Sequence, residues 1–210
     1  MSLAVDRYEL GPIGTNSYVV RAADDARDGV VIDPGDGPRI EAELGRTGAA
    51  CVAILITHGH WDHVIGVAQL ARTTGAPVHM AAEERMLLED ILRWAPDFAQ
   101  AEPATVDVPL DGNETLDLAG ISFETLRVPG HSPAHLAYSA DGCLFSGDVL
   151  FAGSVGRTDL PGARWETLVE SIRMLADRFP PETTVYPGHG TETTLGAELE
   201  RNPFLAELRA

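Results

Sequence analysis

The first third of the chain alternates short apolar runs with segments of helical spacing. The run 52–56 is apolar throughout, which is typical of a strand that is covered on both faces. Ile40 and Leu44 are four positions apart, as on one face of a helix. The pattern predicts strands at 16–20, 29–32, 52–56 and 78–80, and helices at 39–46, 62–74 and 82–94.

From residue 103 onward, the pattern changes to short strands separated by turns, with Asp141-Gly142 as a hairpin signal. A helix is expected at 165–179, and another in the tail at 191–208, which Pro203 interrupts. Strands are expected as a short series within 103–123, and then at 123–128, 135–139, 144–145 and 183–186. Two β-rich halves flanked by helices indicate a layered α/β sandwich, and the length of 210 residues favours one domain over 1–210.

The composition is that of a globular chain, since hydrophobic residues make up 44% of it. The longest apolar run, 51–56, is far shorter than the roughly 20 residues that a membrane-spanning helix needs. No basic stretch followed by an apolar one stands at the N-terminus, so no secretory signal is predicted. We therefore expect a cytoplasmic protein with no membrane partner.

The charge excludes several classes of function. The formal net charge is −17, and such a surface repels the phosphate backbone of nucleic acids. All fifteen cationic residues are arginine, which excludes Schiff-base lysines and the P-loop lysine. The two cysteines, Cys51 and Cys143, form no CxxC pair and predict neither a zinc knuckle nor a redox site.

Three of the seven histidines fall within six residues, directly after the buried strand that ends at 56. His58 and His60 are two positions apart and point the same way on an extended segment. Asp62 and His63 turn into the predicted helix and point elsewhere. One loop thus presents two pairs of ligands to two neighbouring points, and imidazole with carboxylate suits zinc or a similar divalent ion.

Three later segments repeat the arrangement of a turn and a possible ligand after a predicted strand. His131 and His189 each end a Pro-Gly-His sequence, and Asp148 ends Ser-Gly-Asp. Loops at the carboxyl ends of strands are where open α/β sheets bind ligands. Together with the first cluster, these residues predict a metal site built from four parts of the chain.

The order His-x-His-x-Asp-His, His, Asp, His resembles the metallo-β-lactamase superfamily over nearly the whole chain. The resemblance implies a four-layer αβ/βα sandwich with the site at one edge, between two sheets. It also implies two divalent metal ions, with zinc expected and iron or manganese as alternatives. His58, His60 and His131 would hold the first metal, Asp62, His63 and His189 the second, and Asp148 would bridge them.

The stretch 153–162 and the sequence Asn202-Pro-Phe204 are similar to the short bacterial glyoxalase II branch of that superfamily. This resemblance implies hydrolysis of small 2-hydroxyacyl thioesters by a hydroxide that bridges the metals, with Asp62 orienting and Asp148 bridging. A thiol leaves as thiolate with little protonation, which favours thioesters over lactams. The chain ends without the C-terminal helices of the long enzymes, so we expect modest discrimination between thiol carriers.

An alternative is persulfide dioxygenase, which shares the superfold and a similar Gly-Arg-Thr-Asp stretch. It would use a single iron, here held by His58, His131 and Asp148. Metal content and oxygen uptake distinguish the two activities. The sequence pattern assigns no role to Arg157 or His135, and it specifies neither the acyl group, the thiol nor the oligomeric state.

Overall fold

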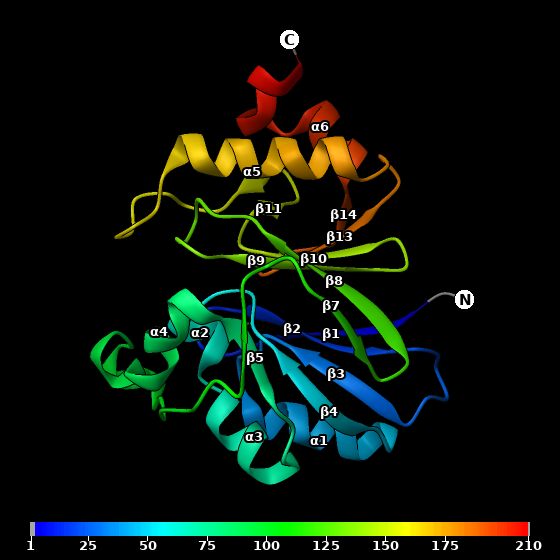
Figure 1. The fold of residues 1–210 in the computed structure, drawn as a ribbon, viewed down its shortest axis with the longest axis vertical. Helices are drawn as coiled ribbons and strands as arrows, with labels where there is room; N and C mark the ends of the chain where they lie inside the picture. Colours follow the sequence, from blue (N-terminus) through cyan, green and yellow to red (C-terminus); the bar gives the residue numbers. More distant parts are fainter. Residues whose placement is uncertain (1–2, 210) are drawn as a thin grey trace.

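The computed structural model of the chain describes residues 3–209. Two six-stranded sheets face each other, and helices cover their outer faces (Figure 1). The first sheet has the order β1 (Ala4–Leu10), β2 (Thr15–Arg21), β3 (Asp28–Ile32), β4 (Ala50–Leu55), β5 (Val78–Ala81) and β6 (Val108–Leu110). The second has the order β14 (Thr193–Thr194), β13 (Thr184–Pro187), β10 (Cys143–Gly147), β9 (Leu136–Ala140), β8 (Ile121–Arg127) and β7 (Thr115–Leu118).

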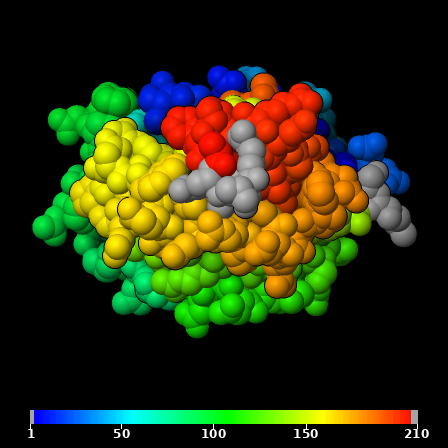
Figure 2. All heavy atoms as spheres, turned by 90° about the horizontal axis from the view of Figure 1, so that it is seen from above, coloured from blue at the N-terminus to red at the C-terminus, as the bar shows by residue number. Residues whose placement is uncertain are grey.

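The helices form the two outer layers. On the first sheet lie α1 (Gly37–Thr47) and α3 (Val67–Thr74), and on the second lies α5 (Trp165–Arg178), with α6 (Leu195–Arg201) beyond it (Figure 1). Seen from above, α5 and the C-terminal segment together cover this end of the molecule (Figure 2). The four layers confirm the predicted αβ/βα sandwich.

Shorter elements fill the connections. They are α2 (Trp61–Val64), η1 (Ala82–Glu84), α4 (Arg85–Glu89), η2 (Ile91–Arg93), η3 (Asp97–Ala99), the hairpin of β11 (Leu150–Phe151) and β12 (Ser154–Val155), and η4 (Pro203–Arg209). No helix within residues 3–209 is long and apolar enough to cross a membrane.

The core has three parts, one between each pair of neighbouring layers. Tyr18, Phe123 and Tyr138 lie buried between the two sheets. Ile40 of α1 packs against the first sheet. Leu168, Ile172 and Leu175, which form an apolar stripe along α5, pack against the second sheet. Each helix buries one face, as its spacing predicted.

The predicted helix 62–74 is wrong as a continuous element, because it breaks between α2 and α3. The Gly66 amide donates to the Pro34 carbonyl at 2.8 Å, so the backbones approach closely. A Cβ at Gly66 would lie 2.4 Å from that oxygen. The loop after β3 is therefore held directly against the segment that carries Asp62 and His63.

Other boundaries also differ from the prediction. The helix expected at 82–94 is divided into η1, α4 and η2, and Leu88 of α4 and Ile91 of η2 are both buried. The strand β1 was not predicted, and residues 103–107 form no strand. In the tail, the helix begins only at Leu195, and the interruption expected at Pro203 is present.

Candidate metal centre

All seven predicted ligands lie in one cluster at the carboxyl ends of strands. Three groups have ligand atoms within 4.8 Å of one another. They are His58, His60 and His131; His58, His63 and Asp148; and Asp62, His63 and His189. The first and third groups coincide with the two triads that the family resemblance implied. The first sheet contributes four of the ligands through the loop after β4, and the second sheet contributes three.

In the first triad, three imidazole nitrogens converge. His60 Nδ1 lies 2.9 Å from His58 Nε2 and 2.8 Å from His131 Nε2. The Nδ1–H of His131 donates to the Arg157 carbonyl at 2.8 Å. His58 Nδ1 lies 3.0 Å from the Thr57 hydroxyl, which itself donates to Asp33 and so accepts from His58. Both Nε2 atoms therefore present a lone pair to His60.

In the second triad, backbone and carboxylate groups fix the rings. His63 Nδ1 donates to Asp33 Oδ2 at 2.9 Å, and His189 Nδ1 donates to the Gly14 carbonyl at 3.3 Å. The Thr15 hydroxyl donates to Asp62 Oδ2 at 2.7 Å. The Nε2 atoms of His63 and His189 then lie 3.3 and 3.2 Å from Asp62 Oδ2. Partners of this kind orient metal ligands in proteins.

Asp148 lies between the two triads. Its Oδ1 is 3.3 Å from His63 Nε2, and its Oδ2 is 3.5 Å from His131 Nε2 and 3.7 Å from His189 Nε2. Within residues 3–209, neither His63 Nε2 nor Asp148 Oδ1 has a hydrogen-bond partner, although both are buried. One carboxylate thus faces a histidine of the first triad and two of the second.

These residues fit divalent cations. At His60 Nδ1 two lone pairs meet one nitrogen, and a single proton can satisfy only one of them. Burial and the neighbouring histidine His131 lower the pKa of His60 to about 4, and burial likewise holds the pKa of His58 well below its usual range. Neutral imidazole is the form that binds metal. A cation at this point would satisfy all three nitrogens at once.

His63 has a different environment from the other rings. Burial lowers its pKa, but the carboxylates of Asp148, Asp62 and Asp33 outweigh burial and raise that pKa well above its usual value. A group of carboxylates strong enough to hold a proton on a buried ring also attracts a metal ion. Metal binding at Nε2 would replace that proton.

Two glycines allow the loops to close around Asp148. A Cβ at Gly188 would lie 2.1 Å from Asp148 Oδ1 and 2.7 Å from His63 Cε1. A Cβ at Gly156 would lie 1.8 Å from the Asp148 carbonyl oxygen. The Pro-Gly-His sequence that ends at His189 therefore needs its glycine for a close approach of two backbones, not only for a turn.

The sequence analysis did not identify Asp33, which directly follows the predicted strand 29–32. Asp33 is buried, has φ 49°, and accepts from the Thr57 amide and hydroxyl as well as from His63. It thereby orients one ligand directly and another through Thr57. Its position in the sequence could have identified it, because Asp33 directly follows a buried strand, as the metal ligands do.

The other histidines, Arg157 and the two cysteines make structural contacts and are not ligands. His135 is buried, and its Nε2 accepts from the Asp148 amide at 3.1 Å, so it helps to hold the Asp148 backbone. The Arg157 guanidinium is exposed and pairs with Asp159, with both contacts at 2.7 Å. His79 is buried in β5 and belongs to none of the three ligand groups. Burial raises the pKa of the Cys51 thiol to about 11 and also raises that of Cys143, so neither thiol is activated.

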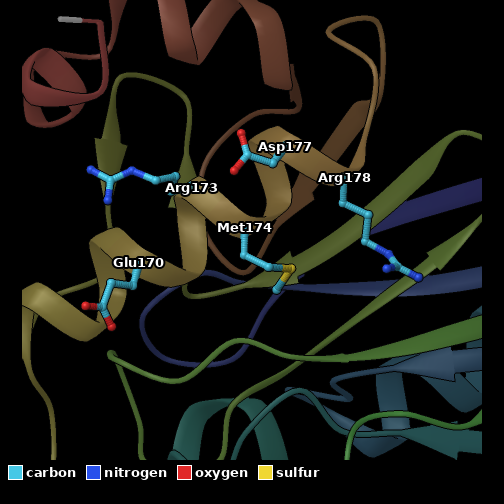
Figure 3. Close-up of a pocket in the computed structure, with 5 residues that line it drawn as sticks. All are labelled: Glu170, Arg173, Met174, Asp177 and Arg178. Carbon is cyan, nitrogen blue, oxygen red and sulfur yellow. The ribbon is translucent and has the colours of Figure 1, made fainter.

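A groove of about 480 Å³ lies over α5 and is lined by Glu170, Arg173, Met174, Asp177 and Arg178 (Figure 3). All five side chains come from one helix, and their polar ends spread apart along it. None of them is a predicted ligand, so the groove offers no convergent chemistry of the kind that the histidine cluster offers.

Comparison with known proteins agrees with this fold. The family model of the metallo-beta-lactamase superfamily matches residues 10–189. The chain belongs to this superfamily. A curated relative is the hydroxyacylglutathione hydrolase GloC of Haemophilus influenzae, 34% identical over 192 residues, which are 87% of this chain and 89% of the relative.

Two solved structures are closely similar. The BLEG-1 B3 metallo-beta-lactamase has a TM-score of 0.90 and 36% identity, covering 97% of this chain and all of that one. TTHA1623, solved in a di-iron-bound form, has a TM-score of 0.85 and 41% identity, covering 96% of this chain and all of that one. These relatives have different reactions or metals in their names, so the reaction of this chain has to be argued from its own residues.

Proposed function

We propose that the chain is a binuclear metal-dependent hydrolase that cleaves small 2-hydroxyacyl thioesters. The observation that carries the proposal is the presence of two complete ligand triads, with Asp148 between them. The similarity to a hydroxyacylglutathione hydrolase over most of both chains supports the choice of substrate class.

The two triads would hold two divalent cations, which when bound would supply a nucleophile at neutral pH and polarise a substrate carbonyl. Five imidazoles and two carboxylates suit zinc, which we expect, and also suit iron or manganese. The di-iron form of TTHA1623 supports iron as an alternative.

The protein's own groups hold this centre and its charge. Thr15 fixes Asp62 through a hydrogen bond, and Asp33 fixes His63, so the second triad keeps its orientation while substrate binds and leaves. Asp148 faces histidines of both triads and would be shared between the two cations. Thr57 and the carbonyls of Gly14 and Arg157 likewise hold ligand rings from outside the cluster.

The leaving group favours a thioester. A thiol with a pKa near ~8.5 leaves as thiolate, whereas an amine has to be protonated as it leaves. An anionic sulfur leaving group is also a good zinc ligand. The arrangement therefore suits thioester hydrolysis better than lactam hydrolysis.

The alternative activity, a persulfide dioxygenase with one iron, would need only His58, His131 and Asp148. In this chain the remaining four ligands are also in place, and Asp62, His63 and His189 form a group of their own. A second intact triad favours two metals, and with them hydrolysis.

The test uses the whole chain, stripped of metal and reloaded separately with zinc, iron or manganese. The substrates are a 2-hydroxyacyl thioester of glutathione, a β-lactam, and glutathione persulfide with an oxygen electrode. We expect thiol release from the thioester, at least a hundredfold faster than lactam opening in kcat/KM, and no oxygen uptake. Faster lactam opening, or oxygen uptake by an iron-loaded chain with no thiol release, would overturn the proposal.

A further inference from the structure

Glu84 is a buried carboxylate outside the ligand set. It lies in η1, directly after β5, and only 3% of its surface is exposed. Its Oε2 accepts from the Gly59 amide and its Oε1 accepts from the Ala134 amide, both at 2.8 Å. A charge this deeply buried needs such partners, and both partners here are backbone groups of the metal centre's loops.

The two amides lie within the segments that carry the first triad. Gly59 stands between His58 and His60, and Ala134 lies three residues after His131. His60 and His131 are 71 positions apart in sequence, yet their nitrogens approach to 2.8 Å. The single carboxylate of Glu84 therefore spans the gap between the two loops whose nitrogens have to meet.

The segment that carries Glu84 also packs directly against the loop. A Cβ at Gly59 would lie 2.5 Å from the Leu87 Cβ, so α4 touches the backbone between the two ligands. The residue before Glu84, Glu83, is exposed and pairs with Arg127 at 2.8 Å. Two adjacent glutamates thus have the same charge and very different surroundings.

The second triad has other supports. His63 is held by Asp33, Asp62 by Thr15, and His189 by the Gly14 carbonyl. None of the hydrogen bonds described for Glu84 reaches a residue of that triad.

We propose that Glu84 is a positioning residue for the first metal site: it ties the loop of His58 and His60 to the loop of His131, so that the three nitrogens converge. The inference rests on the metal binding in the proposed function and is independent of the substrate. It assigns Glu84 no contact with metal or substrate.

The chemistry of the two amides makes the carboxylate specific. A carboxylate offers an acceptor oxygen to each N–H, whereas the amide of glutamine offers one acceptor and one donor group. In the Glu84→Gln variant one loop amide would face an N–H₂ group, although size and shape are nearly unchanged. The Glu83→Gln variant makes the same change of charge on the neighbouring residue and is the matched control.

The experiment measures zinc affinity by competition with a chromophoric chelator, in two backgrounds that each keep one triad. His189→Ala cripples the second triad, and His60→Ala cripples the first. We expect Glu84→Gln to weaken zinc binding about 10- to 100-fold in the His189→Ala background, the usual effect of losing a partner that orients ligands. In the His60→Ala background, Glu84→Gln should change the zinc affinity less than about threefold. The control variant Glu83→Gln should change the zinc affinity less than about threefold in both backgrounds.

Equal affinities with and without Glu84→Gln in the His189→Ala background would overturn the inference. An equal loss in both backgrounds would also overturn it, since that result indicates general structural damage. If circular dichroism shows that metal-free Glu84→Gln is unfolded, Glu84→Asp replaces it. This variant keeps both carboxylate oxygens on a shorter side chain, and its zinc affinity is compared in the same two backgrounds. A wild-type chain that binds no zinc, iron or manganese would overturn the proposed function as well, which distinguishes the two failures.

Discussion

At the scale of single residues, the centre depends on which atom each ligand presents and on what fixes it. Asp33 takes a left-handed backbone conformation that costs free energy, yet its carboxylate accepts three hydrogen bonds from Thr57 and His63. The orientation of His63 thus comes from a residue 30 positions earlier in the chain. Ligand types alone would not give this geometry.

Asp148 is the residue on which both triads depend. We predict that Asp148→Ala lowers the bound metal by at least one equivalent per chain and kcat by at least about a thousandfold, because it removes the group facing both His63 and His131. Elemental analysis and thiol release measure the two effects. Asp159→Ala, which changes an exposed carboxylate paired with Arg157, is the control and should keep both properties. Full metal occupancy in Asp148→Ala would contradict its place between the metals.

At the scale of elements, every ligand loop follows the carboxyl end of a strand, and glycine lets two of these loops meet. The segment between β13 and His189 passes so close to Asp148 that it has no room for a side chain at Gly188. The loop conformation and the ligand geometry therefore depend on each other.

The element-scale prediction concerns Gly188→Ala, which changes no ligand. The new Cβ would lie 2.1 Å from Asp148 Oδ1, so the loop has to move, and we expect zinc affinity to fall at least about tenfold. Gly45→Ala is the control, because Gly45 lies exposed in α1 with nothing within 4 Å of an added Cβ. That variant should bind zinc normally and raise the free energy of unfolding in urea by about 0.5–1 kcal/mol. Normal zinc binding by Gly188→Ala would show that the loop tolerates a side chain.

The sequence predicts strongly periodic elements and ligand types better than boundaries and supports. The stripe of Leu168, Ile172 and Leu175 placed α5, because burial of one helix face leaves a clear period. Strand β1 left no such signal, since it lies at the edge of its sheet and is mostly half-buried. The break at Gly66 depends on a contact with Pro34, which a local pattern does not contain.

The same distinction holds for the metal centre. Histidine and aspartate after strands were visible because these residue types are uncommon together at that spacing. Asp33 and Glu84 were not, because a lone carboxylate in a turn or a helix has no distinctive local pattern. Their roles come from hydrogen bonds to amides and rings 24 to 50 positions away.

At the scale of the whole molecule, the cluster joins the two halves of the sandwich. His58, His60, Asp62 and His63 come from the first sheet, and His131, Asp148 and His189 come from the second. Metal ions at this edge would connect both sheets, so metal binding and the stability of the entire fold are expected to be linked.

Removal of metal should therefore lower the thermal midpoint of unfolding. A ligand present at about a thousand times its Kd stabilises the native state by about 4 kcal/mol. For a chain of this size, that corresponds to a fall of about 10 °C in Tm on adding a strong chelator. Scanning calorimetry with and without chelator measures the shift, and added zinc should reverse it. An unchanged Tm would show that the cluster does not hold the halves together through metal.

The most direct test of the account is a titration of the metal-free chain with zinc, following thiol release from a 2-hydroxyacyl thioester after each addition. The account predicts that hydrolysis is absent without metal, rises with added zinc and reaches its plateau at two equivalents per chain. A plateau at one equivalent, or hydrolysis that persists in the metal-free chain, would contradict the binuclear centre on which the proposed function rests.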